Sequence, residues 1–77
     1  MKHRSLNEIA NEIGEKWPSM YFGAKPYWEA MFSLNSITDK YGYDDGKIIV
    51  LYFLANATTW KGEDAKRIKN ELKQITK

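Results

Sequence analysis

The sequence predicts an all-α protein, built as a compact four-helix bundle or orthogonal array with a helix over residues 45–57 at its centre. Four stretches place apolar residues three or four positions apart, which is the spacing of one helical face. No other stretch offers a strand that could pair with the longest apolar run. The chain has 77 residues, of which 43% are hydrophobic and 29% charged. It therefore has room for one core, and we treat residues 1–77 as a single domain.

The first predicted helix covers residues 5–16. Ser5 and Glu8 have the spacing of a capping box, in which a hydroxyl and a carboxylate each bind the other residue's free backbone amide. Apolar residues follow at helical spacing, and Pro18 disfavours helical geometry at the preceding Trp17. The helix is therefore expected to end close to Trp17.

The second predicted helix begins at Pro26, after a loop over residues 18–24. Proline is well tolerated at the first helical position because the amide that it lacks would have no partner there. The main apolar face of this helix extends to Ile37, while Trp28 and Phe32 lie about 100° around the helix from that face. The helix is apolar over more than half of its circumference, so it must contact neighbours on two sides.

A polar connection over residues 39–46 leads into the third predicted helix, and Asp44 or Asp45 is expected to cap it. Residues 48–55 are all apolar, which is also typical of a buried strand. We prefer a helix because the segment continues through Ala57 and has no partner strand. A helix that is apolar on every side belongs in the middle of a domain, so we expect this one to be central.

The fourth predicted helix covers residues 62–76. Glu63 and Asp64 in its first turn and Lys73 in its last turn match the helix dipole. Its apolar residues form a narrow seam, made of Ala65, Ile68, Leu72 and Ile75. We expect this seam to pack against the other helices.

Five short stretches combine aromatic, glycine, alanine and lysine residues: 21–27, 40–42, 52–57, 60–62 and 65–69. Together they resemble small uncharacterised proteins found in phages and prophages of Gram-positive bacteria, over about residues 5 to 75. The resemblance rests on aromatic and glycine spacing and on no catalytic motif. It implies a cytoplasmic accessory protein of a mobile element, with no known activity and no functional residue to carry over.

Residue types that carry catalysis or bind metals are scarce. The chain has no cysteine and a single histidine, His3, so its serines have no well-placed imidazole base to draw on. The carboxylate pairs Asp44-Asp45 and Glu63-Asp64 lie where helix N-termini favour negative charge. No calcium loop and no glycine-rich phosphate loop occurs in the sequence. We therefore expect no enzymatic activity, no cofactor and no metal.

The chain shows no secretory signal, and its longest apolar run, residues 48–55, is far shorter than the roughly 20 residues of a membrane span. We therefore expect a cytoplasmic protein that does not enter a membrane. Its terminus over residues 1–4 is expected to be flexible.

The leading functional hypothesis comes from the aromatic residues, which make up 14% of the chain. The second helix cannot bury both its main face and its Trp28–Phe32 edge unless the first helix or the 18–24 loop covers that edge. An uncovered edge predicts a surface that binds a protein partner or a second copy of the chain. The simpler alternative is that most of these rings fill the core. The candidate contact residues are Tyr21, Phe22, Trp28, Phe32, Tyr41 and Tyr43.

The alternative hypothesis is weak, sequence-tolerant binding of nucleic acid by the basic end of the chain. Residues 61–77 carry six basic and three acidic residues, a net charge of +3. Docking as a helix-turn-helix is disfavoured because Glu63 and Asp64 would face the groove. Contacts between phosphates and the C-terminal half of this helix are still compatible with the sequence. The simpler alternative is that the lysines form an ordinary solvent-exposed face. The candidate residues are Lys66, Arg67, Lys69, Lys73 and Lys77.

Overall fold

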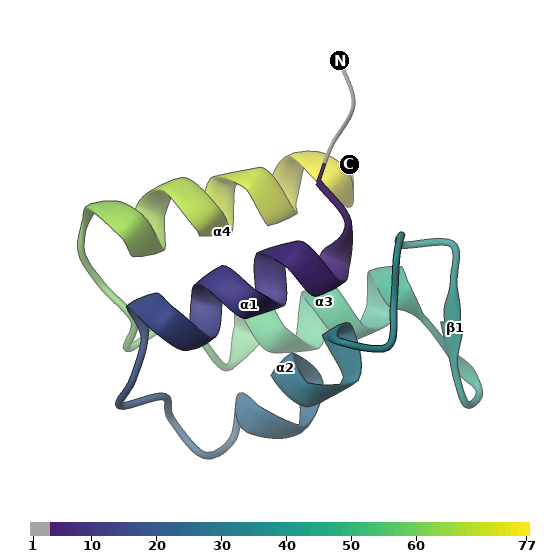
Figure 1. Cartoon of the computed structure of the whole chain (residues 1–77), viewed down its shortest axis with the longest axis horizontal. Helices are drawn as coiled ribbons and strands as arrows, with labels where there is room; N and C mark the ends of the chain where they lie inside the picture. The colour runs from purple at the N-terminus through teal and green to yellow at the C-terminus, as the bar shows by residue number, and fades with distance from the viewer. Residues whose placement is uncertain (1–3) are drawn as a thin grey trace.

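Over residues 4–77, the part of the chain that the computed structural model describes, four helices and one hairpin form around a single core (Figure 1). The elements are α1 (Leu6–Lys16), α2 (Lys25–Met31), β1 (Lys40–Tyr41), β2 (Asp44–Asp45), α3 (Gly46–Ala55) and α4 (Glu63–Ile75). The helices predicted over 5–16, 45–57 and 62–76 are present, with ends that differ by one or two residues. The prediction of an all-α protein is wrong, because residues 40–45 form a small antiparallel sheet.

The N-terminus of α1 is closed by the predicted capping box. The Ser5 hydroxyl accepts a hydrogen bond from the Glu8 amide at 3.4 Å, and the Ser5 amide donates to the Glu8 carboxylate at 3.2 Å. The amides of Leu6 and Asn7 donate to backbone carbonyls of residues 34–35, each at 3.0 Å. The turn after α2 therefore binds amides that have no partner within α1.

The second helix is shorter than predicted, because α2 ends at Met31 and does not extend to Ile37. The next three amides donate to carbonyls three residues back. The Asp39 carboxylate then accepts hydrogen bonds from the amides of Asn35 and Ser36, at 2.8 and 3.3 Å. Side-chain acceptors of this kind compete with a helix for backbone amides. The segment expected as the last part of the helix is therefore a turn.

The hairpin replaces an expected irregular connection. Lys40 pairs with Asp45 and Tyr41 with Asp44 across the two strands. Gly42 is the first residue of the two-residue loop and has a φ of 65°, which suits a type II′ turn. Asp45 precedes α3, but its carboxylate binds the Lys40 Nζ at 2.8 Å and makes no hydrogen bond to the helix. The expected carboxylate cap of the third helix is therefore replaced by a cross-strand ion pair.

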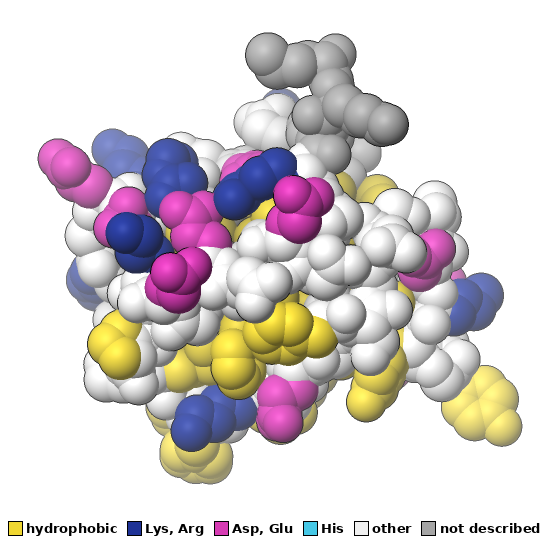
Figure 2. Space-filling view, viewed as in Figure 1, with side chains coloured by type: hydrophobic (Ala, Val, Ile, Leu, Met, Phe, Trp, Pro, Cys, Tyr) yellow, Lys and Arg dark blue, Asp and Glu magenta, His cyan; other side chains and the backbone are white. Residues whose placement is uncertain are grey.

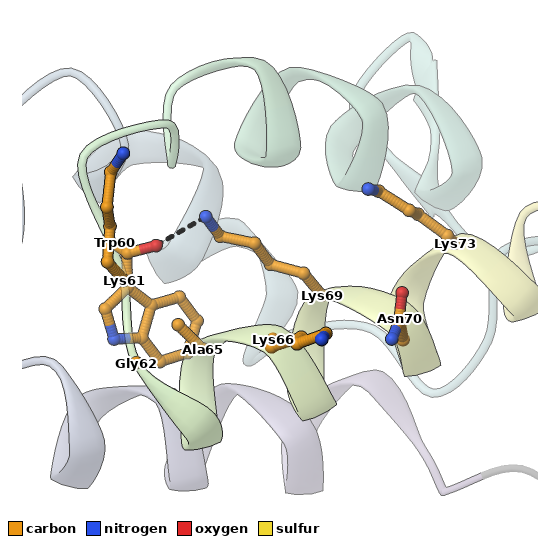
Figure 3. Close-up of a pocket in the computed structure, with 8 residues that line it drawn as sticks. All are labelled: Trp60, Lys61, Gly62, Ala65, Lys66, Lys69, Asn70 and Lys73. Carbon is orange, nitrogen blue, oxygen red and sulfur yellow. Dashed lines mark hydrogen bonds between the residues drawn. The ribbon is translucent and has the colours of Figure 1, made fainter.

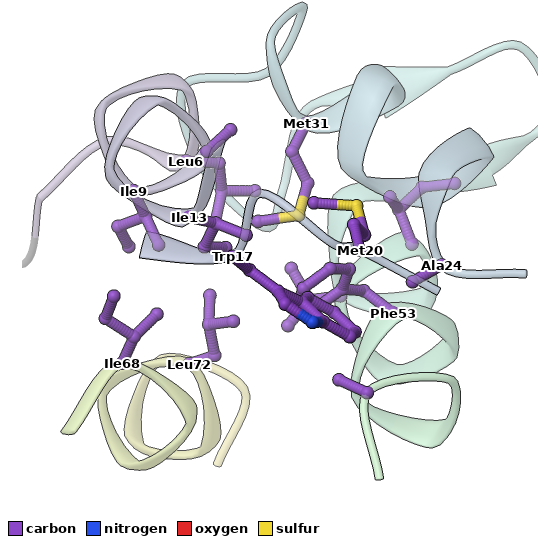
Figure 4. Close-up of a cluster of buried hydrophobic side chains, with 14 of the residues drawn as sticks. Leu6, Ile9, Ile13, Trp17, Met20, Ala24, Met31, Phe53, Ile68 and Leu72 are labelled. Atoms are coloured by element: carbon purple, nitrogen blue, oxygen red, sulfur yellow. The ribbon is translucent and has the colours of Figure 1, made fainter. Parts of the chain in front are cut away.

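The prediction that the third helix is central is wrong. Side chains from all four helices meet in the core (Figure 4), and α3 contributes Ile49, Val50 and Phe53. Its opposite side is exposed, with Leu51 at 43% and Tyr52 at 50%. The reason is a lack of covering elements, because α2 has seven residues and α4 packs on α1. Although α3 is apolar, no helix within residues 4–77 is long and apolar enough to cross a bilayer.

Trp17 connects three parts of the core. Its ring stacks on that of Trp60, with centroids 5.1 Å apart and planes 5° apart. The Phe53 ring lies nearly perpendicular to the Trp17 ring, with planes 79° apart and centroids 6.3 Å apart. Trp17 and Trp60 are 6% and 4% exposed. The stack therefore joins the end of α1 to the connection between α3 and α4, and aromatic pairs of this kind add stability beyond the area that they bury.

The first residue of α3 lies against the backbone of the preceding turn. Gly46 is buried, and a Cβ at this position would lie 2.6 Å from the Ser36 carbonyl oxygen and 3.0 Å from the Ile37 Cα. The Gly46 amide donates to the Asp39 carbonyl at 2.7 Å. A residue without a side chain is needed for this close approach.

Gly46→Ala is expected to lower the free energy of unfolding by about 1–3 kcal/mol, because the added methyl group pushes two backbone segments apart. Intrinsic helix propensity favours alanine over glycine by about 1 kcal/mol, so a loss of stability must come from the contact. Urea unfolding followed by tryptophan fluorescence measures the change. Asn11→Ala is the control, because Asn11 is an exposed residue of α1 and the change places an alanine in a helix without a close contact. An unchanged stability of the Gly46 variant would contradict the close approach.

Candidate functional site

The aromatic residues proposed from the sequence do not form one surface. Tyr21 and Phe22 lie in the loop before α2, are 43% and 76% exposed, and have ring centroids 4.8 Å apart. Tyr41 and Tyr43 lie in the hairpin, on the other side of the molecule from that loop in Figure 1. Tyr43 is fully exposed, at 103%. Two separate aromatic groups are therefore available to solvent.

The remaining two candidates lie against α1. The Trp28 Nε1 donates to the Ala10 carbonyl at 2.8 Å. The Trp28 ring covers Gly14, where a Cβ would lie 2.9 Å from it. Phe32 is 39% exposed and meets the Trp28 ring edge-on, with centroids 5.0 Å apart. Of the two alternatives for the Trp28–Phe32 edge, the structure has the covered one, because α1 lies against Trp28 while Phe32 stays partly exposed.

The sequence analysis missed an apolar surface on the outer side of α3. We define the α3 outer face as the exposed residues of this helix, which are Lys47, Ile48, Leu51, Tyr52 and Ala55. At 100° per residue they span about 140° of the helix. The Tyr52 ring also lies 5.4 Å from that of Tyr27, which connects the face to α2. The length of the chain could have indicated this surface. The other elements of so short a chain are too few to cover every side of an apolar helix.

Charged and apolar side chains separate on the side of the molecule shown in Figure 2. Lysine, arginine and acidic side chains gather over α4 and α1, whereas apolar side chains gather over the region of α2 (Figures 1 and 2). The charged region itself divides into two kinds of environment, one on each side of α4.

On the side of α4 that faces α1, charges alternate in sign. Arg4 binds Glu71 at 2.6 Å and Glu12 at 2.9 Å. Arg67 binds the same Glu12 at 2.6 Å and Asp64 at 3.2 Å. Glu12 therefore bridges two guanidinium groups, and the network ties α1 to α4.

The network explains the titration of its shared carboxylate. The hydrogen bond from Arg67, together with the one from Arg4, lowers the pKa of Glu12 to about 2. Arg67, one of the proposed nucleic-acid contacts, is thus engaged with two carboxylates. Arg4 is the first residue described, so residues 1–3 of the terminus expected to be flexible lie outside the described part of the chain.

On its other side, α4 carries lysines around a shallow depression of about 300 Å³ (Figure 3). We call it the lysine groove, and it is lined by Trp60, Lys61, Gly62, Ala65, Lys66, Lys69, Asn70 and Lys73. None of its four lysines forms an ion pair with a carboxylate of residues 4–77. The structure thus brings together three lysines proposed from the sequence and adds Lys61. Lys77 is exposed beyond the end of α4 and does not line the groove.

Lys69 is the most restrained of these lysines. Its Nζ donates to the Trp60 carbonyl at 2.6 Å (Figure 3). Burial of the side chain, with Lys73 and Lys61 nearby, lowers the pKa of Lys69 below its ordinary value. Each cause acts against the charged form, and an anion bound in the groove would counter the repulsion from Lys73 and Lys61.

One carboxylate of each pair considered for catalysis has another partner in the structure. Asp45 binds Lys40, and Asp64 binds Arg67. His3 lies outside the described part of the chain. Among the residues that are described, no group of three or more acidic or histidine side chains is placed to hold a metal ion. The geometry of this chain therefore offers two surfaces for binding, the α3 outer face and the lysine groove.

Comparisons of the chain with protein-family models, curated proteins and solved structures found no match. The resemblance to phage and prophage proteins therefore stays a prediction. Any function proposed for this chain must rest on its own residues and their geometry.

Glu12→Gln is expected to lower the free energy of unfolding at neutral pH by about 1 kcal/mol, the upper end for exposed ion pairs, because two arginines lose their shared partner. The pKa of Glu12 in the folded chain, about 2, lies below the ordinary value of 4.5. Its stabilising effect is therefore complete above pH 4.5 and is lost as the pH falls toward 2. Urea unfolding at several pH values should show the wild-type and variant stabilities converging over this range.

The matched control for this measurement is Glu15→Gln. This change removes a carboxylate of the same helix that makes no ion pair with the described residues. It should leave the pH dependence of unfolding close to that of the wild-type chain. A stability difference between Glu12→Gln and the wild-type chain that persists to pH 2 would contradict the assigned role of the network.

Proposed function

We propose that this chain is a non-enzymatic protein-interaction module that binds a second copy of itself through the α3 outer face. The observation that carries the proposal is that one helix has a buried side and an exposed side that are both apolar. Contiguous apolar surface of this kind is typical of protein-binding sites. The cytoplasmic setting expected from the sequence is part of the proposal.

The charge on this face favours an antiparallel pairing of two α3 helices about a two-fold axis. Lys47 is the one charged residue of the α3 outer face, and it lies in the first turn. In an antiparallel pair each Lys47 lies near the C-terminus of the other α3, where the helix dipole is negative. A parallel pair would instead bring the two like charges together.

The same pairing uses the aromatic residues at both ends of α3. A Cβ at Gly23 would contact both the Tyr21 ring and the Asn56 side chain, so the Tyr21–Phe22 pair lies close to the C-terminus of α3. The hairpin with its two tyrosines leads directly into the N-terminus of α3. An antiparallel pair therefore places the loop of one copy opposite the hairpin of the other, and the two-fold axis repeats this contact.

The size of the surface sets the expected strength of the dimer. A standard interface buries about 800 Å² on each partner. The whole chain exposes 5076 Å², so such an interface would cover roughly a sixth of it. The α3 outer face has five residues and must be extended by the loop and the hairpin to reach that size. We therefore expect a dissociation constant in the micromolar range, at the weak end for standard interfaces.

Leu51→Glu is expected to weaken self-association at least tenfold, because it places a charge in the middle of the apolar contact, which corresponds to about 1.4 kcal/mol or more. Sedimentation equilibrium over a wide concentration range measures the dissociation constant. Phe32→Glu is the matched control, since Phe32 is 39% exposed, against 43% for Leu51, and lies outside the proposed surface. Circular dichroism checks that both variants fold. A wild-type chain that stays monomeric at high micromolar concentration would overturn the proposed dimer.

The antiparallel arrangement is tested by oxidative cross-linking, which is clean because the chain has no cysteine. Leu51 lies near the middle of α3, so two copies of Leu51→Cys should meet near the two-fold axis and form a disulfide, for which the Cα atoms must approach to about 4.4–6.8 Å. Tyr43→Cys is the control, because Tyr43 is more exposed but belongs to hairpins at opposite ends of the dimer. Faster cross-linking of Tyr43→Cys would contradict this arrangement.

A further inference from the structure

The basic residues on the two sides of α4 differ in their partners. Arg67 is held by carboxylates on the side that faces α1. Lys66, Lys69 and Lys73 fall within about 60° of one another at 100° per residue, on the other side of the helix. Lys61 joins them from the connection before α4 (Figure 3). Four lysines thus share one depression that no described carboxylate enters.

The lysines of the groove repel one another. Lys69 and Lys73 are separated by one helical turn, at which like charges are destabilising. Lys69 is also half-buried, and it donates a hydrogen bond to the Trp60 carbonyl, which carries no full charge. A bound anion would remove this repulsion, so the groove is complementary to negative charge.

We infer that the lysine groove binds the phosphate backbone of nucleic acid without reading its sequence. Along the axis of α4, Lys66 and Lys73 lie about 10 Å apart at a rise of 1.5 Å per residue. A duplex carries one negative charge for about every 1.7 Å of its axis. A row of this length can therefore contact several successive phosphates, whereas a single small anion would use only part of it.

The groove lacks the groups that read bases. The Trp60 ring is 4% exposed and stacked on Trp17, so it is closed to a base. Arg67, whose fork could bind guanine, is held by two carboxylates. Glu63 and Asp64 in the first turn disfavour insertion of this end of α4 into the major groove. The remaining donors are lysines, which contact phosphates as point charges.

This inference is independent of the proposed dimer, because the lysine groove belongs to α4 and the connection before it. The test is fluorescence anisotropy with labelled duplexes of about 20 base pairs and two unrelated sequences, titrated at several salt concentrations. We expect both duplexes to bind equally and the logarithm of the affinity to fall with the logarithm of salt with a slope of about −2 to −4, for two to four neutralised phosphates.

Lys66→Gln and Lys73→Gln should each reduce that slope by about 1 and weaken binding at low salt by about tenfold. Both side chains are exposed, so these changes leave the core intact. Lys25→Gln is the charge-matched control, since Lys25 is an exposed lysine at the start of α2. Leu51→Glu should bind the duplex as the wild-type chain does, which separates this surface from the α3 outer face.

Three results would overturn the inference. The first is no binding of either duplex at low salt. The second is an equal loss of affinity in Lys25→Gln, which would show a general charge effect in place of a site. The third is equally tight binding of polyglutamate, or full competition by inorganic phosphate at constant ionic strength, which would assign the groove to an acidic polypeptide or to a small anion.

Discussion

Two indole rings hold the helices of this chain in their positions. Trp17 ends α1 and Trp60 lies in the connection before α4, and their rings stack in parallel. The Phe53 ring of α3 packs nearly perpendicular to that of Trp17. Because Trp60 is fixed in the core, the start of α4 is fixed beside α1, and the seam residues Ile68 and Leu72 are fully buried. The Trp60 carbonyl points the other way and accepts a hydrogen bond from a groove lysine. One residue therefore connects the packing of the core to the shape of the lysine groove.

The short length of the chain explains why one helix stays half-exposed. A domain of 77 residues has a high ratio of surface to volume, and its elements cannot enclose one another fully. In this fold α1 and α4 bury each other's apolar sides, while α2 is too short to cover more than one side of α3. Association with a second chain is a common way for small domains to gain buried area. The α3 outer face is the place where this fold has such area to offer.

The basic residues on the two sides of α4 differ both in type and in the partners that their positions give them. Arginine has a planar fork that suits carboxylates, and Arg67 uses it to bridge Glu12 and Asp64. The lysines lie farther around the helix, where α1 supplies no acidic partner. The resulting separation keeps the ion pairs between α1 and α4 apart from the lysines that pair with no carboxylate of residues 4–77. It also keeps the lysine groove apart from the apolar α3 outer face.

The amino-acid sequence by itself determined the features that depend on neighbouring residues. The capping box at Ser5, the ends of three helices and the shared side of Lys66 and Lys73 all follow from local spacing, and the structure has them. Tertiary structure decided the length of the second helix, the hairpin and the exposure of α3, because these features depend on which distant groups lie nearby. Asp39 binds amides that a longer second helix would have needed, and the strands of the hairpin are too short to show an alternating pattern. The exposure of α3 also depended on tertiary contacts. The periodicity of a sequence shows which side chains are apolar, but it does not show whether another element packs against them.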